Sequence, residues 1–293
     1  MSDAAGSTPR PFWRVGTAGW SYRDWNGVVY PAPRPRGFDE LADLAERFDV
    51  IEINSTFYRP PAPEVAAQWA ARVAHVPAFT FTAKLHRDFT HGDAWPAGAV
   101  PAFLDGIAPL EAAGRLDALL VQFPWFFRND AAGRERVTRI AETFGAGRPL
   151  VVELRHDSWT RPEALAWLGE RRLALCSIDL PRATTTPPPV AFVTAEIAYL
   201  RLHGRNADAW FSRKADRDAK YDYRYSDAEL ADWIARLRAI EERVRTIYVI
   251  ANNHFVGQAA ANAFQLRARL TGERVPIPPT LIARYPDLAE IDA

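Results

Sequence analysis

The fold is decided by residues 50–86, which read VIEINSTFYRPPAPEVAAQWAARVAHVPAFTFTAKLH. The β-branched run Val50–Phe57 and the apolar run Phe79–His86 predict two strands, and the amphipathic run Pro63–Arg72 between them predicts a helix. Proline at the first helical position and Glu64 in the first turn are typical of a helix N-terminus. A strand, a helix and a strand in this order predict two parallel neighbouring strands.

The same alternation continues in both directions along the chain. Its short apolar runs predict strands at Arg14–Thr17, Val50–Phe57, Phe79–His86, Leu116–Phe123, Pro149–Arg155, Leu173–Asp179, Ala198–His203 and Thr246–Asn252. Its amphipathic runs predict helices at Phe38–Phe48, Pro63–Arg72, Pro101–Ala113, Ala131–Phe144, Arg161–Arg171, Asp227–Arg243 and Val256–Leu270. Residues 181–196 contain three consecutive prolines and are predicted to form a loop in place of a helix. Eight strand units favour an α/β fold of the (β/α)8 TIM-barrel type, and no GxGxxG motif follows the first strand.

Length and composition limit the domain structure. The chain has 293 residues, of which 48% are hydrophobic and 25% are charged, and these values are ordinary for a globular domain. A barrel of this type takes about 250 residues. We therefore expect one barrel domain at residues 13–272, an N-terminal tail at residues 1–12 and a C-terminal tail at residues 273–293.

Charge and cysteine content limit the partners. The 36 basic and 36 acidic residues give no net charge, so no overall field attracts a polyanion or a membrane surface. The N-terminus lacks the apolar segment of a signal peptide, and no long apolar run is present. The single cysteine, Cys176, excludes an intramolecular disulfide and a cysteine-based metal cage. We expect a cytoplasmic protein without a membrane partner.

Polar side chains gather at the predicted strand ends. Side chains in a barrel alternate between the interior and the helix layer, and one of the two alternate sets is polar near nearly every strand end. The polar set is Glu52, Asn54, Thr56, Thr82, Lys84, His86, Gln122, Glu153, Arg155, Ser177, Asp179, Tyr199, Arg201, His203 and Asn252. Because barrel active sites lie at the C-terminal ends of the strands, this pattern predicts a polar pocket there. The alternative is an ion-pair network that only closes the barrel end.

Several ordered blocks of sequence accompany these strand ends. They are Gly16-Thr17-Ala18-Gly19-Trp20-Ser21-Tyr22, Glu52-Ile53-Asn54-Ser55-Thr56-Phe57-Tyr58-Arg59, Gln122-Phe123-Pro124, Glu153-Leu154-Arg155-His156, Arg201-Leu202-His203-Gly204 and Asn252-Asn253. In these blocks the chain resembles the DUF72 family, also called YecE-like proteins, over roughly residues 14–270. The resemblance implies a TIM barrel with a polar cleft and assigns no reaction to it.

Four residues are candidate catalytic groups. Glu52, Glu153 and Asp179 are carboxylates that would serve as acid and base in glycoside hydrolysis or isomerisation. Lys84 is the fourth, either as a Schiff-base lysine or as an ion-pair partner of Glu52.

Further residues are candidate substrate-binding groups. Guanidinium groups suit phosphate and carboxylate, amides orient hydroxyl groups, and aromatic rings stack on sugars or bases. The set is Trp20, Tyr22, Asn54, Thr56, Gln122, Arg155, His156, Arg201, His203, Asn252 and Asn253.

Metal chemistry is the less favoured alternative. His86, His156 and His203 are metal-ligand types, but no HxH or HExxH spacing supports a site. We therefore predict no cofactor and no metal ligand, with a divalent metal as the alternative.

The preferred interpretation is an enzyme with a site at the C-terminal mouth of the barrel. It would be a hydrolase or isomerase that acts on a small anionic, phosphorylated, sugar-like or nucleotide-like substrate. The loop at residues 204–225, which carries Trp210, Arg213 and Tyr221, is predicted to be a lid over this mouth or a flap that contacts a polymer, and the alternative is a solvated, partly disordered loop. The alternatives are a non-catalytic protein that binds nucleic acid or a nucleotide, and a scaffold whose polar mouth is structural.

Overall fold

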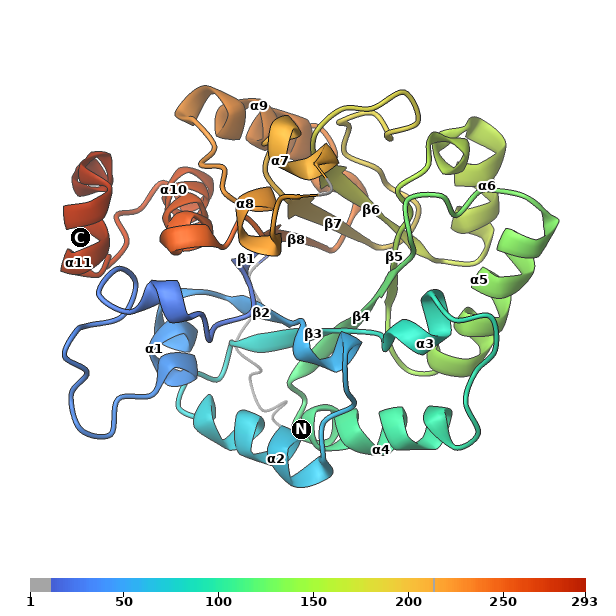
Figure 1. Ribbon diagram of the computed structural model, residues 1–293, viewed down its shortest axis with the longest axis horizontal. Helices are drawn as coiled ribbons and strands as arrows, with labels where there is room; N and C mark the ends of the chain where they lie inside the picture. Colours follow the sequence, from blue (N-terminus) through green and yellow to red (C-terminus); the bar gives the residue numbers. More distant parts are fainter. Residues whose placement is uncertain (1–11, 213) are drawn as a thin grey trace, which may run out of the picture.

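The strands of the barrel are short parallel segments that close into a ring (Figure 1). The computed structural model describes residues 12–212 and 214–293. The strands are β1 Trp13–Ala18, β2 Val50–Ile53, β3 Thr80–Lys84, β4 Leu116–Gln122, β5 Leu150–Glu153, β6 Ala174–Asp179, β7 Ile197–Leu202 and β8 Thr246–Ala251. Each strand pairs in parallel with the next, and β8 pairs with β1. The prediction of a (β/α)8 TIM barrel is confirmed.

Helices surround the ring of strands (Figure 1). They are α1 Glu40–Arg47, α2 Pro63–Arg72, α3 Arg87–Thr90, α4 Ala99–Ala112, α5 Ala131–Phe144, α6 Pro162–Glu170, α7 Ala207–Phe211, α8 Arg217–Lys220, α9 Asp227–Arg238, α10 Gln258–Thr271 and α11 Pro279–Arg284. All seven predicted helices are present, and α9 starts at a capping box in which Ser226 and Glu229 satisfy each other's backbone N–H groups. Residues 181–196, all of which are described, contain no helix, as their prolines predict.

Two apolar layers hold the barrel together. Between strands and helices lies the larger layer, which includes Ile51 and Ile53 of β2 and Leu200 and Leu202 of β7. A smaller apolar cluster lies inside the barrel. It consists of Ala18, Val50, Ala118, Leu120, Val151, Ala174, Cys176, Ile178, Leu180, Ile197, Tyr199, Tyr248 and Ile250. The inner cluster fills the barrel below the polar strand ends. The charged groups at those ends therefore lie directly above apolar side chains.

The predicted orientation of β6 is wrong. Neighbouring Cα partners in a parallel sheet point their side chains to the same face, and Cys176 and Ile178 pair with the inward-facing Tyr199 and Arg201. Ser177 and Asp179 therefore face the helices. Polarity alone does not reveal this, because Ser177 and Asp179 have polar partners in the outer layer: Ser177 Oγ accepts from the backbone N–H of Phe192, and Arg205 pairs with Asp179.

The C-terminal segment packs against the barrel. Residues 273–293, expected as a tail, form α11 and a 3-10 turn at Pro286–Glu290, and Leu281 and Leu288 are fully buried. The Tyr285 hydroxyl donates to the Val256 carbonyl oxygen at 2.8 Å. Of the expected N-terminal tail at residues 1–12, only Phe12 lies within the described residues.

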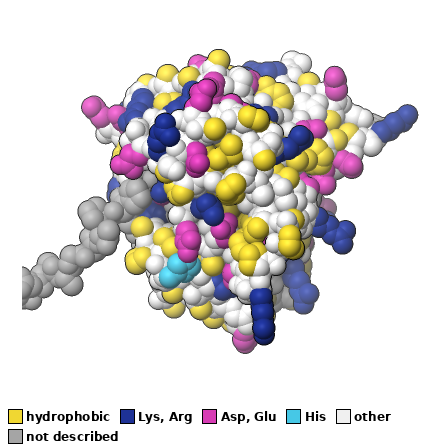
Figure 2. All heavy atoms as spheres, turned by 90° about the vertical axis from the view of Figure 1, so that its left-hand side faces the viewer, with side chains coloured by type: hydrophobic (Ala, Val, Ile, Leu, Met, Phe, Trp, Pro, Cys, Tyr) yellow, Lys and Arg dark blue, Asp and Glu magenta, His cyan; other side chains and the backbone are white. Residues whose placement is uncertain are grey.

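Surface charges are intermixed on the face shown in Figure 2, where basic and acidic side chains alternate. This distribution agrees with the zero net charge of the chain. Among the described residues, no helix combines the length and the apolar character that crossing a membrane requires.

We expect Leu281→Ala to lower the free energy of unfolding by about 2–5 kcal/mol, because it leaves a cavity in a fully packed site. Urea denaturation measures this loss. Glu290→Ala, at an exposed position of the same segment, is the matched control and should stay within about 0.5 kcal/mol of the parent. Equal stability of the two variants would contradict the packing of the C-terminal segment.

Candidate functional site

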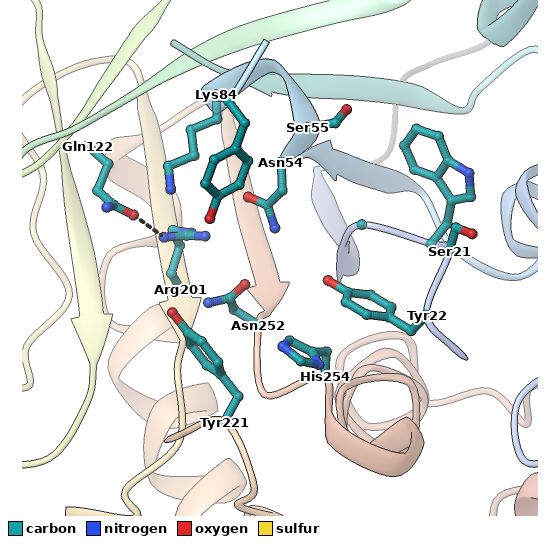
Figure 3. A pocket seen from close by; sticks show the side chains of 13 residues that line it. Ser21, Tyr22, Asn54, Ser55, Lys84, Gln122, Arg201, Tyr221, Asn252 and His254 are labelled. Carbon is teal, nitrogen blue, oxygen red and sulfur yellow. Dashed lines mark hydrogen bonds between the residues drawn. The ribbon is translucent and has the colours of Figure 1, made fainter. Parts of the chain in front are cut away.

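A cavity of about 350 Å³ opens at the C-terminal ends of the strands (Figure 3). Side chains at the ends of β3, β4 and β7 line it, together with residues of the loops that follow β1, β2, β7 and β8. The lining residues are Gly19, Trp20, Ser21, Tyr22, Asn54, Ser55, Tyr58, Lys84, Gln122, Arg201, Tyr221, Asn252 and His254. Seven of the predicted site residues belong to this set, namely Trp20, Tyr22, Asn54, Lys84, Gln122, Arg201 and Asn252.

Arg201 bridges two buried carboxylates beneath the cavity. Its Nη2 lies 2.6 Å from Glu52 Oε1, and its Nη1 donates to Glu153 Oε2. Arg155 Nε donates to the other oxygen of Glu153 at 2.6 Å. Both carboxylates are fully buried and Arg201 is 1% exposed, so low dielectric strengthens these contacts. Two negative and two positive charges balance in this ion network.

Neutral groups complete the ion network from the sides. The Tyr199 hydroxyl donates to Glu52 Oε2 at 2.9 Å and lies 2.8 Å from Thr82 Oγ1. Gln122 Oε1 accepts from both Arg155 and Arg201 at 3.3 Å. The oxygens of Glu52 and Glu153 are therefore occupied by donors from the protein.

Glu52 and Glu153 are counter-ions of the two arginines and do not line the cavity. Burial alone would raise the pKa of Glu153, but the charges of Arg201 and Arg155 outweigh it and hold this pKa well below its usual range. Neither Glu52 nor Glu153 lines the cavity. The geometry does not favour the predicted role of this pair as acid and base.

Lys84 stands apart from the ion network. Its side chain comes from the end of β3 and lines the cavity, and the residue is 8% exposed. Among the described residues its amine makes no hydrogen bond or ion pair, and Nζ lies 3.9 Å from the Phe57 ring centre. Burial, followed by the charge of Arg201, lowers the pKa of Lys84 to about 7, although Glu153 and Glu52 act in the opposite direction. The amine is thus a neutral group for part of the time near neutral pH.

Asp179 lies outside the site, contrary to the prediction. Arg205 holds both its oxygens, with Nε at 2.7 Å and Nη2 at 2.6 Å. The Trp233 indole N–H and the Tyr225 hydroxyl, the latter at 3.1 Å, also donate to it. This carboxylate faces the helix layer because of the register of β6, and it anchors α9 to the barrel.

Five other predicted residues support the site without lining it. Thr56 Oγ1 donates to the carbonyl oxygen of Lys84 at 2.6 Å, and Asn253 Nδ2 donates to that of Tyr223 at 2.8 Å. Burial lowers the pKa of His203 to about 3, and its Nδ1 lies 2.9 Å from Asn252 Nδ2. His156 accepts from the backbone N–H of Ser158. The fifth, Arg155, belongs to the ion network.

His254 and Tyr221 are lining residues that the sequence did not single out as binding groups. The His254 ring stacks on Tyr22 with centres 4.4 Å apart, and Tyr221 lies 5.2 Å from His254. His254 directly follows Asn252-Asn253 at the end of β8, and this position was the available signal.

The loop at residues 204–225 reaches the cavity, and its predicted role as a lid stays a prediction. Tyr221 lines the cavity, and the Trp210 ring lies 6.0 Å from His203. Arg213 lies outside the described residues.

No group of three or more histidine, cysteine, aspartate or glutamate side chains converges within the part of the chain that the structure describes. His156 and His203 point to different partners, so the described residues offer no donor set for a metal ion.

Comparison with known proteins places this geometry in a family. A family model described as "Protein of unknown function DUF72" matches residues 14–284. The UPF0759 protein YunF of Bacillus subtilis (strain 168) is 26% identical over 273 residues, which are 86% of this chain and 92% of that protein.

Solved structures agree with this match. A DUF72 family protein from Thermotoga maritima MSB8 is 31% identical with a TM-score of 0.77, covering 89% of this chain and 100% of that one. A DUF72 family protein from Enterococcus faecalis V583 is 27% identical with a TM-score of 0.78, covering 88% and 95%. The matches confirm the resemblance seen in the sequence blocks, and the names of these proteins state no reaction.

We expect Glu153→Gln to lower the free energy of unfolding by about 3–5 kcal/mol, because it leaves buried Arg201 without one of its charge partners. Glu196→Gln is the matched control, since Glu196 forms an exposed pair with Arg245. The control should cost about 0–1 kcal/mol. Similar losses in the two variants, measured by urea denaturation, would contradict the structural role of Glu153.

Lys84→Met should make the protein more stable, and more so at pH 6 than at pH 9. The pKa of Lys84 is about 7 in the folded state and 10.5 as the ordinary value. Between these values the unfolded chain binds a proton that the folded protein lacks, so this group makes stability rise with pH. The stability gain from Lys84→Met should shrink by on the order of 2 kcal/mol from pH 6 to pH 9. A pH-independent difference between variant and parent would show that the amine titrates normally.

Proposed function

The chain belongs to the DUF72 family, and we propose that it is an enzyme that acts on a small, anionic, sugar-like molecule beside Lys84. One observation carries this proposal. The Lys84 amine faces the cavity with no hydrogen-bond or ion-pair partner among the described residues, while the carboxylates Glu52 and Glu153 are already balanced by Arg201 and Arg155. A protonated Lys84 is therefore an excess positive charge in the mouth, and an anionic ligand would compensate it.

The other lining groups suit hydroxyl and phosphate oxygens. The side chains of Asn54, Tyr221 and Lys84 all line the cavity and have no hydrogen-bond partner among the described residues. Figure 3 shows Asn54, Asn252 and Lys84 directed toward the same space. Buried or half-buried polar groups are normally paired, so unpaired donors that converge on a cavity favour a polar ligand.

The size of the cavity favours a small molecule. Its volume of about 350 Å³ lies near the lower end of the range for small-molecule sites. A sugar, a sugar acid or a sugar phosphate suits this volume better than a polymer such as nucleic acid. The wall formed by Tyr22 and Tyr221 supplies aromatic surface for the apolar face of a sugar ring.

Between the two reaction classes expected from the sequence, isomerisation fits the geometry better than hydrolysis. Glycoside hydrolysis by the usual route needs two carboxylates that reach the substrate, and Glu52 and Glu153 are occupied by arginines. Isomerisation of a sugar needs proton transfer beside a carbonyl group, and a group with a pKa near the working pH is suited to it. The pKa of Lys84, about 7, meets this condition. A cytoplasmic location, favoured by the single buried Cys176, is part of the proposal.

Ligand binding tests this function directly. Thermal denaturation and calorimetry with ribose 5-phosphate, glucose 6-phosphate, gluconate and inorganic phosphate should identify at least one stabilising compound, whereas neutral glucose should stabilise less. A ligand at 100 times its Kd stabilises the fold by about 2.7 kcal/mol.

Lys84→Met should weaken the binding of that compound by at least about tenfold, because it removes a cavity-lining charge that has no ion-pair partner among the described residues. Lys214→Met is the matched control, since Lys214 is exposed and does not line the cavity. Binding of single-stranded oligonucleotides with no response to any of these small molecules would favour the non-catalytic alternative.

A further inference from the structure

We propose that the Lys84 amine forms an imine with the carbonyl carbon of an aldehyde or ketone that also carries a phosphate or carboxylate group. This inference rests on the proposed function and adds covalent chemistry and a substrate class to it. It starts from the position of the amine, which lies at the end of β3 in a cavity of about 350 Å³.

The local structure presents the amine as a nucleophile. The backbone of Lys84 is fixed from both sides, since its carbonyl oxygen accepts from Thr56 and its strand pairs with β4. The Phe57 ring lies 3.9 Å from Nζ and leaves the cavity as the direction for approach. Among the described residues no carboxylate forms an ion pair with Nζ, in contrast to the buried arginines beside it. A lysine without a counter-ion and next to other cations is the arrangement that frees an amine lone pair for attack.

The protonation state supports the same role. The pKa of Lys84, about 7, leaves about half of the amine neutral at pH 7, compared with less than about one part in a thousand for an ordinary lysine. Only the neutral amine has a lone pair for the carbonyl carbon. The low pKa therefore removes the main barrier to imine formation near neutral pH.

The step balances without a further reactant. The nitrogen lone pair of Lys84 forms a bond to the carbonyl carbon, the carbonyl π pair moves to oxygen, and a proton moves from nitrogen to that oxygen. The hydroxyl group then takes a second proton and leaves as water, while the nitrogen lone pair forms the C=N bond. The carbonyl compound, the neutral amine and one proton from solvent thus give a protonated imine and one water molecule. No atom is oxidised or reduced.

Charge balance defines the second group on the substrate. The protonated imine carries one positive charge beside a network in which Glu52 and Glu153 are already offset by Arg155 and Arg201. A phosphate or carboxylate on the same small molecule would compensate that charge inside the cavity. The amides of Asn54 and Asn252, which line the same cavity as the amine, would hold the hydroxyl groups of the substrate.

The lysine content of the chain makes the test specific. The chain has three lysines, Lys84, Lys214 and Lys220, and only Lys84 lines the cavity. The protein is incubated at pH 7 with dihydroxyacetone phosphate, glyceraldehyde 3-phosphate or pyruvate in the presence of cyanoborohydride. This reagent reduces an imine to a stable secondary amine, and peptide mapping by mass spectrometry locates the added mass.

We expect an adduct on Lys84 at least about tenfold above that on Lys214 with one or more probes, since only Lys84 lies in the cavity that would bind the probe. Its yield should saturate with probe concentration, and glycerol 3-phosphate, which has no carbonyl group, should compete. Lys84→Arg keeps a positive charge and should lose the adduct, whereas Lys214→Arg should keep it.

Three results would overturn the inference in distinguishable ways. Binding of sugar phosphates without any reducible adduct on Lys84 would reject the imine and leave the proposed function standing. Absence of both binding and adduct would reject the imine together with the proposed function. Labelling of Lys84 and Lys214 to the same extent, without saturation, would also reject the imine.

Discussion

The site depends on the Arg201 guanidinium, which bridges Glu52 and Glu153 inside the barrel. A charge in the dry interior of a barrel is tolerated only when it is paired and hydrogen-bonded. Arg201 meets that condition for two strands at once and joins the ends of β2, β5 and β7 across the barrel. By occupying both carboxylates it leaves the amine of Lys84 as a cavity-lining group that has no ion-pair partner among the described residues. The stability of the mouth and the chemistry proposed for it therefore depend on the same arginine.

The interior below the ion network is built in layers. At the N-terminal end of the strands, Arg14 lies 3.3 Å from Asp117, which also accepts from the Tyr248 hydroxyl at 3.0 Å. Above this pair lie the apolar side chains of the inner cluster, including Leu120 and Val151. A buried ion pair and its hydrogen bonds thus close the bottom, apolar packing fills the middle, and the ion network around Arg201 occupies the top. Because barrel substrates approach from the top, the one charged layer that meets the cavity lies where it can contact a ligand.

The fold was predictable because alternation of strands and helices is a local property of the sequence, and all eight strands were found. The orientation of side chains was predictable only where a strand alternates cleanly, as β7 does with Tyr199 and Arg201 against Leu200 and Leu202. In β6 the polar Ser177 and Asp179 share the helix-facing side, where Arg205 pairs with Asp179, so polarity predicted the wrong face for them. Ion-pair partners were not predictable either. Arg201 and Glu52 are 149 residues apart, and their contact depends on strand register and on the curvature of the barrel.

Closure of the barrel also builds the wall of the cavity. Tyr22 follows β1 and His254 follows β8, and their rings stack only because the first and last strands pair. The loop at residues 204–225 supplies the third ring, Tyr221, and hydrogen bonds hold it near both ends: Asn253 donates to the Tyr223 carbonyl oxygen, and the backbone N–H of Gly204 donates to the Tyr225 hydroxyl. Gly204 itself has a φ of +94°, and a Cβ there would lie 2.7 Å from that of Tyr223, so the start of this loop requires glycine. An open sheet with the same strands would still carry Lys84 at the end of β3, but Tyr22 and His254 would no longer be neighbours. The complete lining of the cavity therefore depends on closure of the barrel.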